Sequence, residues 1–388
     1  MLGLMQDYPL LVNSVIDHAA LNHGEREMVT RGVEGPIRRT TLADVRSRSL
    51  RVAKALEKEG VKLGDRIATM AWNTERHAES WFGIMGNGAI YHTLNPRLFA
   101  EQLVYIVNHA EDRLMFVDLT FLPLVEALQD KFPTVEKYIV LTDGEHMPDT
   151  KLANAEAYEE WIGGVDDDFQ WKTFDENTAA GLCYTSGTTG NPKGVLYSHR
   201  SNVLHGLMVN QPDVFGMHSE VTIMAIVPMF HANAWALTFA APAAGAKMVM
   251  PGAGMDGPSI YELLDSEKVT ATAAVPTVWL GLLQYLEETG KKLPYLEKVV
   301  VGGAANANIK IRKFELDYGV EVVHGWGMTE MSPLGTTGKM KYATAHLDQE
   351  EKLKLKEKQG RTPFLVEMKI VDDEGKELPR DGKTSGHL

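Results

Sequence analysis

The chain contains 388 residues and carries a formal net charge of −13 at pH 7. A single hydrophobic core usually stops growing at about 250–300 residues, so two or more packed units are expected. The acidic residues are spread along the whole chain, which argues against nucleic acid as a partner held by bulk electrostatics. Any phosphate group must therefore be bound by a local site.

The cysteine content and the apolar segments indicate a protein that is neither exported nor membrane-spanning. Cys183 is the only cysteine, which excludes an internal disulfide, and its apolar neighbours predict a buried strand residue. Residues 1–21 lack the basic end and apolar core of a secretory signal. Residues 221–246 contain no Asp, Glu, Lys or Arg, but their two prolines favour a buried strand, turn and helix over a membrane span. We expect a cytoplasmic protein, with a homodimer as the default oligomer.

Segments of helical periodicity alternate with short apolar runs, which is the pattern of helices covering mostly parallel sheet. Residues 42–60 are predicted to form a helix that ends in glycine, and residues 66–72 to form the strand after it. The other predicted buried strands are 113–117, 138–141, 221–227, 247–250, 269–275, 299–301 and 320–323. The sequence therefore predicts an α/β fold.

Two changes in composition divide the chain. Residues 163–177 are polar and aperiodic, which predicts a linker. The Lys- and Glu-rich run at 350–358 predicts a solvated helix, and residues 367–378 predict a strand, a turn and a second strand.

A loop rich in glycine and hydroxyl groups, Tyr184–Val195, has the composition of a phosphate-binding loop. Its glycines let phosphate oxygens approach the backbone, and Lys193 adds a positive charge. The Walker pattern requires glycine before this lysine and Ser or Thr after it, but Pro192 and Gly194 occupy those places. A loop of this composition alone is more often an unliganded surface turn, so further motifs are needed to support a ligand.

A second glycine-rich segment, at 252–257, matches the dinucleotide-binding fingerprint. No acidic residue follows at the distance needed to hold a ribose, because residues 274–278 read Ala-Val-Pro-Thr-Val. Prolines also flank the segment on both sides. A plain strand-to-helix turn is the better interpretation.

Further motifs follow the phosphate loop in a fixed order. They are the Pro-Met-Phe-His segment within 227–235, the glycine-rich 301–305, the His-Gly-Trp-Gly-Met-Thr-Glu run at 324–330 and the Gly-Arg-Thr-Pro at 360–363. With the loop, they resemble the adenylate-forming superfamily of acyl-CoA synthetases, luciferases and peptide-synthetase adenylation domains. Within it, the chain is most similar to bacterial medium-chain acyl-CoA synthetases and methylmercaptopropionate-CoA ligases.

The resemblance implies the large N-terminal domain of such an enzyme, with two doubly wound sheet-and-helix subdomains and a small β-rich subdomain. We place the first subdomain at 1–175, the second, with the phosphate loop and acyl pocket, at 176–338, and the start of the β-rich part at 339–388. The sequence stops before the family's ribose-binding Asp, hinge and terminal catalytic Lys. These 388 residues are therefore expected to lack the C-terminal lid domain, either because the sequence is incomplete or because the protein is a stand-alone large domain. A protein that ended there should bind ATP and acid but turn over poorly.

The resemblance also implies ATP, Mg²⁺ and coenzyme A as ligands and assigns residues to them. The residues with catalytic roles are Thr185, Lys193, His231, Thr329 and Glu330, and Glu330 is also the expected Mg²⁺ ligand. The nucleotide-binding residues are Thr185, Ser186, Gly187, Thr188, Thr189, Lys193, Ala304, Ala305, His324, Gly325, Trp326, Gly327, Met328 and Thr329. Trp326 replaces the family's usual tyrosine and keeps a flat face for adenine. The acyl pocket is expected to contain His231, Trp235, Gly302 and Pro333.

These assignments predict an ATP-dependent carboxylic acid–CoA ligase that forms an acyl-adenylate and then an acyl-CoA. Its partners would be small molecules, and the bulk of Trp235 favours a short or medium-chain acid such as 3-(methylthio)propanoate. One alternative is a non-catalytic domain that binds a nucleotide or an acyl-adenylate, which pyrophosphate exchange would distinguish. The other is an adenylating enzyme with a different acceptor, which product analysis with CoA as the only thiol would distinguish.

Overall fold

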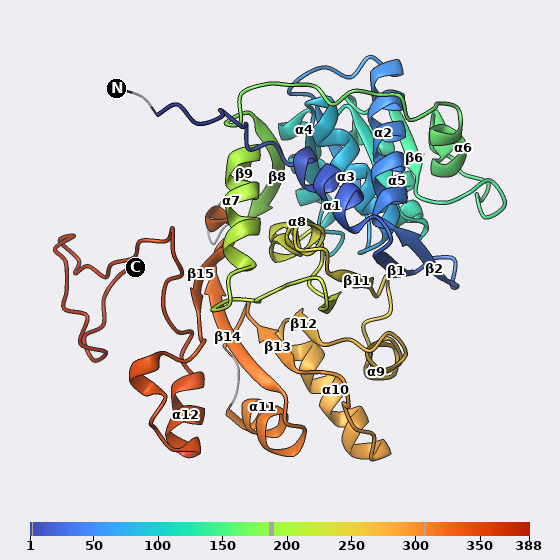
Figure 1. The fold of residues 1–388 in the computed structure, drawn as a ribbon. Coiled ribbons are helices and arrows are strands. Elements are labelled where there is room, and N and C mark those ends of the chain that lie inside the picture. Colours follow the sequence, from blue (N-terminus) through green and yellow to red (C-terminus); the bar gives the residue numbers. More distant parts are fainter. Residues whose placement is uncertain (2, 186–189, 306–307) are drawn as a thin grey trace.

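The structure is a computed structural model that describes residues 1, 3–185, 190–305 and 308–388. Two mostly parallel sheets with helices packed against them make up the fold, which confirms the predicted α/β class (Figure 1). The C-terminal segment, red in Figure 1, extends to one side of the second sheet.

The first sheet has seven strands among the described residues, in the order β7-β6-β5-β3-β4-β8-β9. Neighbours pair in parallel, except that β8 and β9 form an antiparallel hairpin. The strands are β3 (Arg66–Met70), β4 (Ile90–Thr93), β5 (Leu114–Val117), β6 (Lys137–Val140), β7 (Ala155–Ala157), β8 (Ala179–Thr185) and β9 (Lys193–Ser198).

The second sheet has eight strands in the described part of the chain, in the order β15-β14-β13-β12-β10-β11-β1-β2. Each edge of this sheet is an antiparallel pair, β14 with β15 at one edge and β1 with β2 at the other. The strands are β1 (Glu27–Arg31), β2 (Ile37–Thr41), β10 (Thr222–Ala225), β11 (Lys247–Met250), β12 (Ala271–Ala274), β13 (Lys298–Val301), β14 (Glu321–Gly327) and β15 (Leu334–Thr337).

Helices cover these sheets. They are α1 (Asn13–His23), α2 (Leu42–Lys58), α3 (Glu75–Asn87), α4 (Ala100–Ala110), α5 (Leu122–Leu128), α6 (Tyr158–Gly163), α7 (His199–Val209), α8 (Leu237–Ala243), α9 (Gly257–Ser266), α10 (Pro276–Thr289), α11 (Asn308–Arg312) and α12 (Gln349–Lys356). No helix in the described ranges is long and apolar enough to cross a membrane.

One hydrophobic core joins the two sheets, and α3 lies within it. Every residue of α3 is buried. Trp81 of this helix stacks on Tyr91 of β4, with ring centroids 4.3 Å apart, and its ring centroid lies 5.9 Å from that of Phe239 in α8. Since β4 belongs to the first sheet and α8 connects strands of the second, these contacts hold the two sheets together.

Most elements predicted from the sequence are present. The helix predicted at 42–60 is α2, which begins with a capping box formed by Thr41 and Asp44 and is followed by Gly60 at φ +73°. The predicted strands correspond to β3, β5, β6, β10, β11, β12, β13 and β14, of which β14 runs four residues further than expected. The buried Cys183 lies in β8, as predicted.

The three ambiguous segments also have the predicted forms. Residues 164–178 contain neither helix nor strand, residues 221–246 form β10, a short turn and α8, and residues 252–257 connect β11 to α9. Asp256 caps α9 by accepting a hydrogen bond from the backbone N–H of Ser259, at 2.9 Å.

The subdomain limits at 175 and 338 stay a prediction. Strand pairing crosses the limit at 175. β1 and β2 belong to the second sheet, whereas β8 and β9 belong to the first.

The C-terminal part differs from its prediction. Residues 338–388 contain no strand, so the expected β-rich character is not observed there. Around the predicted turn at 372–376, Val371 forms only single bridges to Glu377 and His387, because no longer strand lies beside this exposed segment to extend the ladder. The helix predicted to be solvated is α12, but its Leu353 is buried in the second core cluster.

Candidate active site

A pocket of about 250 Å³ opens at the carboxyl ends of parallel strands in the second sheet. Ligands of open α/β sheets normally bind at this edge. The residues that line the pocket are Val209, Val214, Phe215, His231, Ala232, Trp235, Val300–Gly303, Val323, Gly325–Thr329, Pro333, Leu334, Thr336 and Thr337. None of these described residues is Asp, Glu, Lys or Arg, so the pocket suits an uncharged, largely apolar group.

His231 and Trp235 belong to a turn whose backbone dihedral angles are rare for residues other than glycine. Residues 232–236, the short helix η3 (Ala232–Ala236), all have positive φ, from +45° at Ala232 to +64° at Ala236. Non-glycine residues avoid this left-handed region, at a cost of about 1–2 kcal/mol each, because Cβ crowds the following carbonyl oxygen. Such a conformation persists only where surrounding contacts determine it. The turn is therefore a strained element at the pocket wall.

Trp235 packs closely against the end of β13. A methyl group built on Gly302 would lie 3.0 Å from Cη2 of Trp235, closer than ordinary van der Waals contact. Gly302 therefore leaves room for the indole, and the two residues together form one wall of the pocket. The sequence prediction that Trp235, Gly302 and Pro333 share a pocket with His231 agrees with this geometry.

His231 is exposed to the pocket rather than packed in the core. Desolvation by the surrounding protein, followed by the positive charge of Arg97, lowers the pKa of His231 below its ordinary value. The imidazole is therefore neutral at pH 7, and it can donate a hydrogen bond to a carboxylate or carbonyl oxygen from one ring nitrogen.

The predicted phosphate loop connects the two strands of the β8–β9 hairpin. Thr185 pairs with Lys193 across the hairpin, and the Thr185 hydroxyl lies 3.4 Å from the Lys193 carbonyl oxygen. Lys193 is exposed at this end of the hairpin, where its ammonium group can reach an anionic ligand. The predicted ligands Ser186, Gly187, Thr188 and Thr189 lie outside the described residues.

Tyr197 connects the phosphate hairpin to the Thr-Glu motif. Its hydroxyl donates to the carbonyl oxygen of Thr329, at 2.6 Å, and spans 132 residues of sequence. Burial raises the pKa of Tyr197, so the hydroxyl stays protonated and remains a donor. Helix α7 then runs from the hairpin toward β15, where the backbone N–H of Leu334 donates to Nε2 of His205, at 3.1 Å (Figure 1). These bonds place Lys193 and Thr329 on neighbouring elements.

The predicted nucleotide residues divide into two groups. Gly325, Trp326, Gly327, Met328 and Thr329 line the pocket, and the ring of Trp326 covers Gly335, where a methyl group would lie 2.5 Å from Cζ3. Ala304 and Ala305 are exposed after β13 and lie outside the lining. His324 is 1% exposed within β14, so the prediction that it contacts the nucleotide finds no support in this arrangement.

Glu330 is exposed beside Thr329 in the short helix η5 (Thr329–Met331). Among the described residues it forms no ion pair, and no cluster of three or more metal-binding side chains occurs there. A single carboxylate is nonetheless what Mg²⁺ needs when phosphate oxygens and water supply its other ligands. Glu330 fits that role, and a site made entirely of protein ligands does not occur in the described residues.

Several pocket residues were not found from the sequence. Val209 at the end of α7, and Val214 and Phe215 in the turn after it, have the composition of ordinary core residues, so no signal separates them from core positions. Tyr197 lies near the phosphate loop in sequence, but nothing in its spacing indicates a bond to Thr329.

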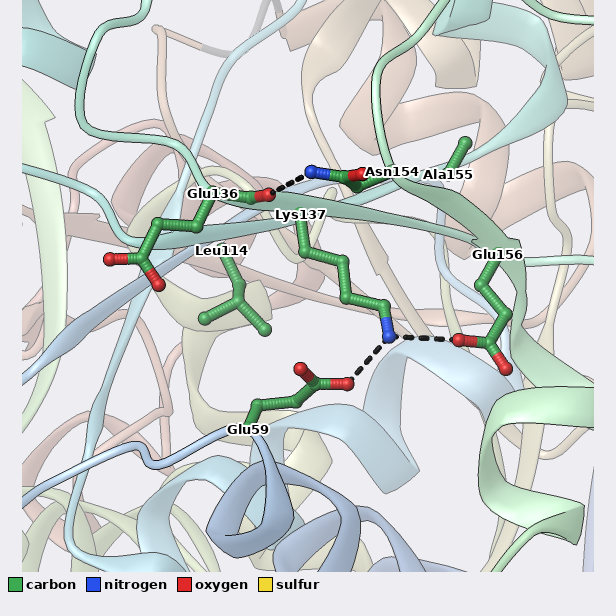
Figure 2. A pocket seen from close by; sticks show the side chains of 7 residues that line it. All are labelled: Glu59, Leu114, Glu136, Lys137, Asn154, Ala155 and Glu156. Carbon is green, nitrogen blue, oxygen red and sulfur yellow. Dashed lines mark hydrogen bonds and ion pairs between the residues drawn. The ribbon is translucent and has the colours of Figure 1, made fainter.

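Figure 2 shows a second hollow, which differs from the pocket in its position and in the charge of its lining. It has a volume of about 510 Å³ and lies where β5, β6 and β7 begin, at the amino ends of parallel strands. Lys137 forms ion pairs with Glu59, at 2.5 Å, and Glu156, at 2.8 Å. Its charged side chains are already engaged in ion pairs within the protein, so the hollow is a weaker candidate for a ligand site.

Comparisons with known proteins identify the family to which this chain belongs. Residues 16–388 match the profile of the AMP-binding enzyme family. The chain is 48% identical, over all of its length and 72% of the relative, to a 3-methylmercaptopropionyl-CoA ligase of Ruegeria lacuscaerulensis. It is 45% identical, over all of its length and 71% of the relative, to a medium-chain-fatty-acid–CoA ligase of Ectopseudomonas oleovorans.

Among solved structures, the anthranilate CoA ligase AuaEII in complex with anthranoyl-AMP is similar in fold. It has a TM-score of 0.83 at 23% identity, and the match covers 97% of this chain and 69% of that structure. The family profile and the relatives at 45–48% identity cover the chain almost completely. This chain therefore belongs to the AMP-binding enzyme family.

Proposed function

We propose that this chain acts as an ATP-dependent carboxylic acid–CoA ligase on a short or medium-chain acid, such as the thioether acid 3-(methylthio)propanoate. The observation that carries this proposal is an uncharged pocket that begins beside Trp326–Thr329 and is walled by Trp235 and Gly302. The CoA ligases named above, at 45% identity or more, support the same activity.

The reaction has two halves. A carboxylate oxygen attacks the α-phosphorus of ATP, and pyrophosphate leaves; the thiol of CoA then attacks the acyl carbon, and AMP leaves. No protein nucleophile is needed, but the carboxylate and the polyphosphate repel each other, so the protein must neutralise charge and hold the reacting atoms in line.

The residues of the site suit these tasks. The ammonium group of Lys193 and the hydroxyl of Thr329 can bind phosphate oxygens, and the neutral imidazole of His231 can donate to the acid in the pocket. Mg²⁺ held by Glu330 would supply further positive charge to the phosphate oxygens when bound. The face of Trp326 is available to stack on adenine.

The size of the pocket favours a small acyl group. Its volume of about 250 Å³ lies below the ~300–1,000 Å³ of typical small-molecule sites. The indole of Trp235 occupies the space over Gly302 into which a longer chain would extend. We therefore expect an acid of a few carbons to be bound better than a long-chain fatty acid.

The test is CoA-dependent AMP release with a panel of acids: propanoate, 3-(methylthio)propanoate, octanoate, palmitate and benzoate. We expect the highest kcat/KM with the short and medium aliphatic acids. Equal rates with palmitate would refute the substrate class. AMP release that does not require CoA would indicate a different acceptor, and tight binding of an acyl-adenylate analogue with no turnover would indicate a binding domain.

A further inference from the structure

We propose that Asn73 is a positioning residue for the acid-binding pocket, and that its side-chain amide sets the place of His231 and Trp235. Asn73 lies after β3, at the carboxyl edge of the first sheet, whereas the pocket belongs to the second sheet. The inference deepens the proposed function and rests on it, because it assigns a role in binding the acyl group.

The amide of Asn73 makes three hydrogen bonds to one stretch of backbone. Its Nδ2 donates to the carbonyl oxygens of Ala225 and Val227, both at 2.7 Å. Its Oδ1 accepts from the backbone N–H of Met229, also at 2.7 Å. Ala225 is the last residue of β10, and Val227 and Met229 follow it. Asn73 therefore fixes the backbone at the point where the chain leaves the strand.

The chemistry of these partners determines the orientation of the amide. Two carbonyl oxygens can only accept and a backbone N–H can only donate, so the reversed amide would satisfy none of the three contacts. Asn73 is 0% exposed, so water does not replace the bonds if the amide is lost. The side chain is fully committed to holding this one stretch of backbone.

The held stretch leads directly to the pocket wall. The backbone N–H of His231 donates to the carbonyl oxygen of Pro228, at 3.0 Å, so the segment 228–231 forms a turn that starts inside the region bound by Asn73. The left-handed residues 232–236 follow at once. A shift at Met229 would therefore move His231 and Trp235 together.

Hydrogen bonds to the backbone of Asn73 and of the residue before it fix the position of Asn73 itself. Its backbone carbonyl accepts a hydrogen bond from the N–H of Gly252, at 3.2 Å, in a bridge to the segment after β11. The preceding Trp72 donates its backbone N–H to Asp118, at 2.6 Å. Asn73 is thus held between the two sheets, and it does not belong to the lining of the pocket.

A second asparagine provides a matched control. Asn87 also belongs to the first sheet's part of the chain and is 0% exposed. Its Nδ2 donates to the carbonyl oxygen of Ala53, at 2.9 Å, and its Oδ1 accepts from Nζ of Lys172, at 3.3 Å. The bond to Ala53 joins α3 to α2 and does not involve the second sheet. Substitution of Asn87 therefore perturbs a buried amide without disturbing the pocket wall.

The experiment compares Asn73→Asp and Asn73→Ser with Asn87→Asp in the full chain. Aspartate keeps the shape but turns the two donated bonds into contacts between oxygen atoms, and serine is the milder change. Dissociation constants would be measured by calorimetry for AMP and for 3-(methylthio)propanoyl sulfamoyl-adenosine, an uncleaved analogue of the acyl-adenylate. Thermal unfolding would report the general loss of stability.

We expect Asn73→Asp to raise the Kd of the acyl analogue at least tenfold and Asn73→Ser about threefold to tenfold, while the Kd of AMP changes less than twofold. Asn87→Asp should lower Tm but leave both constants within twofold. Equal effects on AMP and on the analogue, or no effect on either, would overturn the assignment. So would failure of both Asn73 variants to fold beside a folded Asn87→Asp.

The same measurements separate this inference from the proposed function. If the wild-type chain binds the acyl analogue no better than AMP, the proposed function and the inference both fail. If the wild type binds the analogue tightly and the Asn73 variants keep that preference, the inference alone fails.

Discussion

The pocket at the second sheet and the charged hollow at the first sheet differ in strand polarity and in chemistry. The pocket lies at carboxyl strand ends, has a volume of about 250 Å³ and is lined by residues without fixed charge. The hollow of Figure 2 lies at amino ends, is larger at about 510 Å³ and contains the paired charges of Glu59, Lys137 and Glu156. Size alone would favour the hollow, whereas strand polarity and a lining free of paired charges favour the pocket as the site.

The largest expected effect concerns the two lysines. Replacing Lys193 with methionine removes the charge that we propose binds phosphate oxygens, and we expect kcat/KM for ATP to fall by about 10²-fold or more. Replacing Lys137 with methionine should leave kcat/KM within twofold, because its charge is used within the hollow. Steady-state AMP release measures both, and equal losses would remove the distinction between the two regions.

The next effect concerns the depth of the pocket. Replacing Trp235 with alanine removes the indole over Gly302, so octanoate and decanoate should gain about tenfold in kcat/KM relative to 3-(methylthio)propanoate. Trp235→Phe should give an intermediate ratio. An unchanged ratio in the alanine variant would show that another part of the lining sets the chain length.

The charged hollow should matter for stability instead. Burial opposes ionisation of Glu59, but the hydrogen bonds from Lys137 and Trp161, with the positive charges of Lys137 and Arg113, outweigh it and lower the pKa of Glu59 below its ordinary value. The pair therefore stabilises the fold above pH 4.5 and loses this contribution as the pH falls through the lowered pKa. We expect Lys137→Met to reduce the free energy of unfolding by about 1–2 kcal/mol at pH 7, since it leaves two carboxylates without their partner. Urea unfolding should show a smaller difference between variant and wild type at pH 3.5, and a constant difference would exclude the ion pair as its origin.

The smallest expected effect concerns the left-handed turn. Ala234 and Ala241 are both 0% exposed, but Ala234 has φ +50° and Ala241 lies in α8. Glycine relieves the strain at position 234 while losing a buried methyl group, so Ala234→Gly should change the free energy of unfolding by less than about 0.5 kcal/mol. Ala241→Gly should lose about 1–2 kcal/mol. Equal losses in urea unfolding would indicate that the turn is not strained.

The helices and strands could be predicted from the sequence where the signal lies within the element itself. Apolar runs such as 247–250 and the glycine-ended helix at 42–60 carry their own signals, and the buried parallel strands follow from them. The pairing of β1 and β2 with the second sheet was not predictable, because it depends on contacts more than 200 residues apart. The C-terminal strands were predicted from the residue pattern of 367–378. A strand also needs a neighbouring strand to pair with, and the local pattern carries no information on whether one is present.

The site was predictable where residues lie in contiguous motifs. His231, Trp235, Gly302 and Trp326 came from ordered motifs and share one pocket. His324 belongs to the same motif, but strand alternation turns it into the interior. Asn73 and Tyr197 act through hydrogen bonds across 132–156 residues, which no local pattern encodes. The left-handed turn was also hidden, since an alanine-rich segment favours a right-handed helix.

The most direct test of the account is binding of 3-(methylthio)propanoyl sulfamoyl-adenosine to the wild-type chain, measured by calorimetry beside AMP and sulfamoyl-adenosine. If the pocket holds the acyl group next to the nucleotide, the acyl analogue should bind at least 100-fold more tightly than AMP, and Trp235→Ala should reduce that preference. An analogue that binds no more tightly than AMP would contradict the assignment of the pocket as the acyl site.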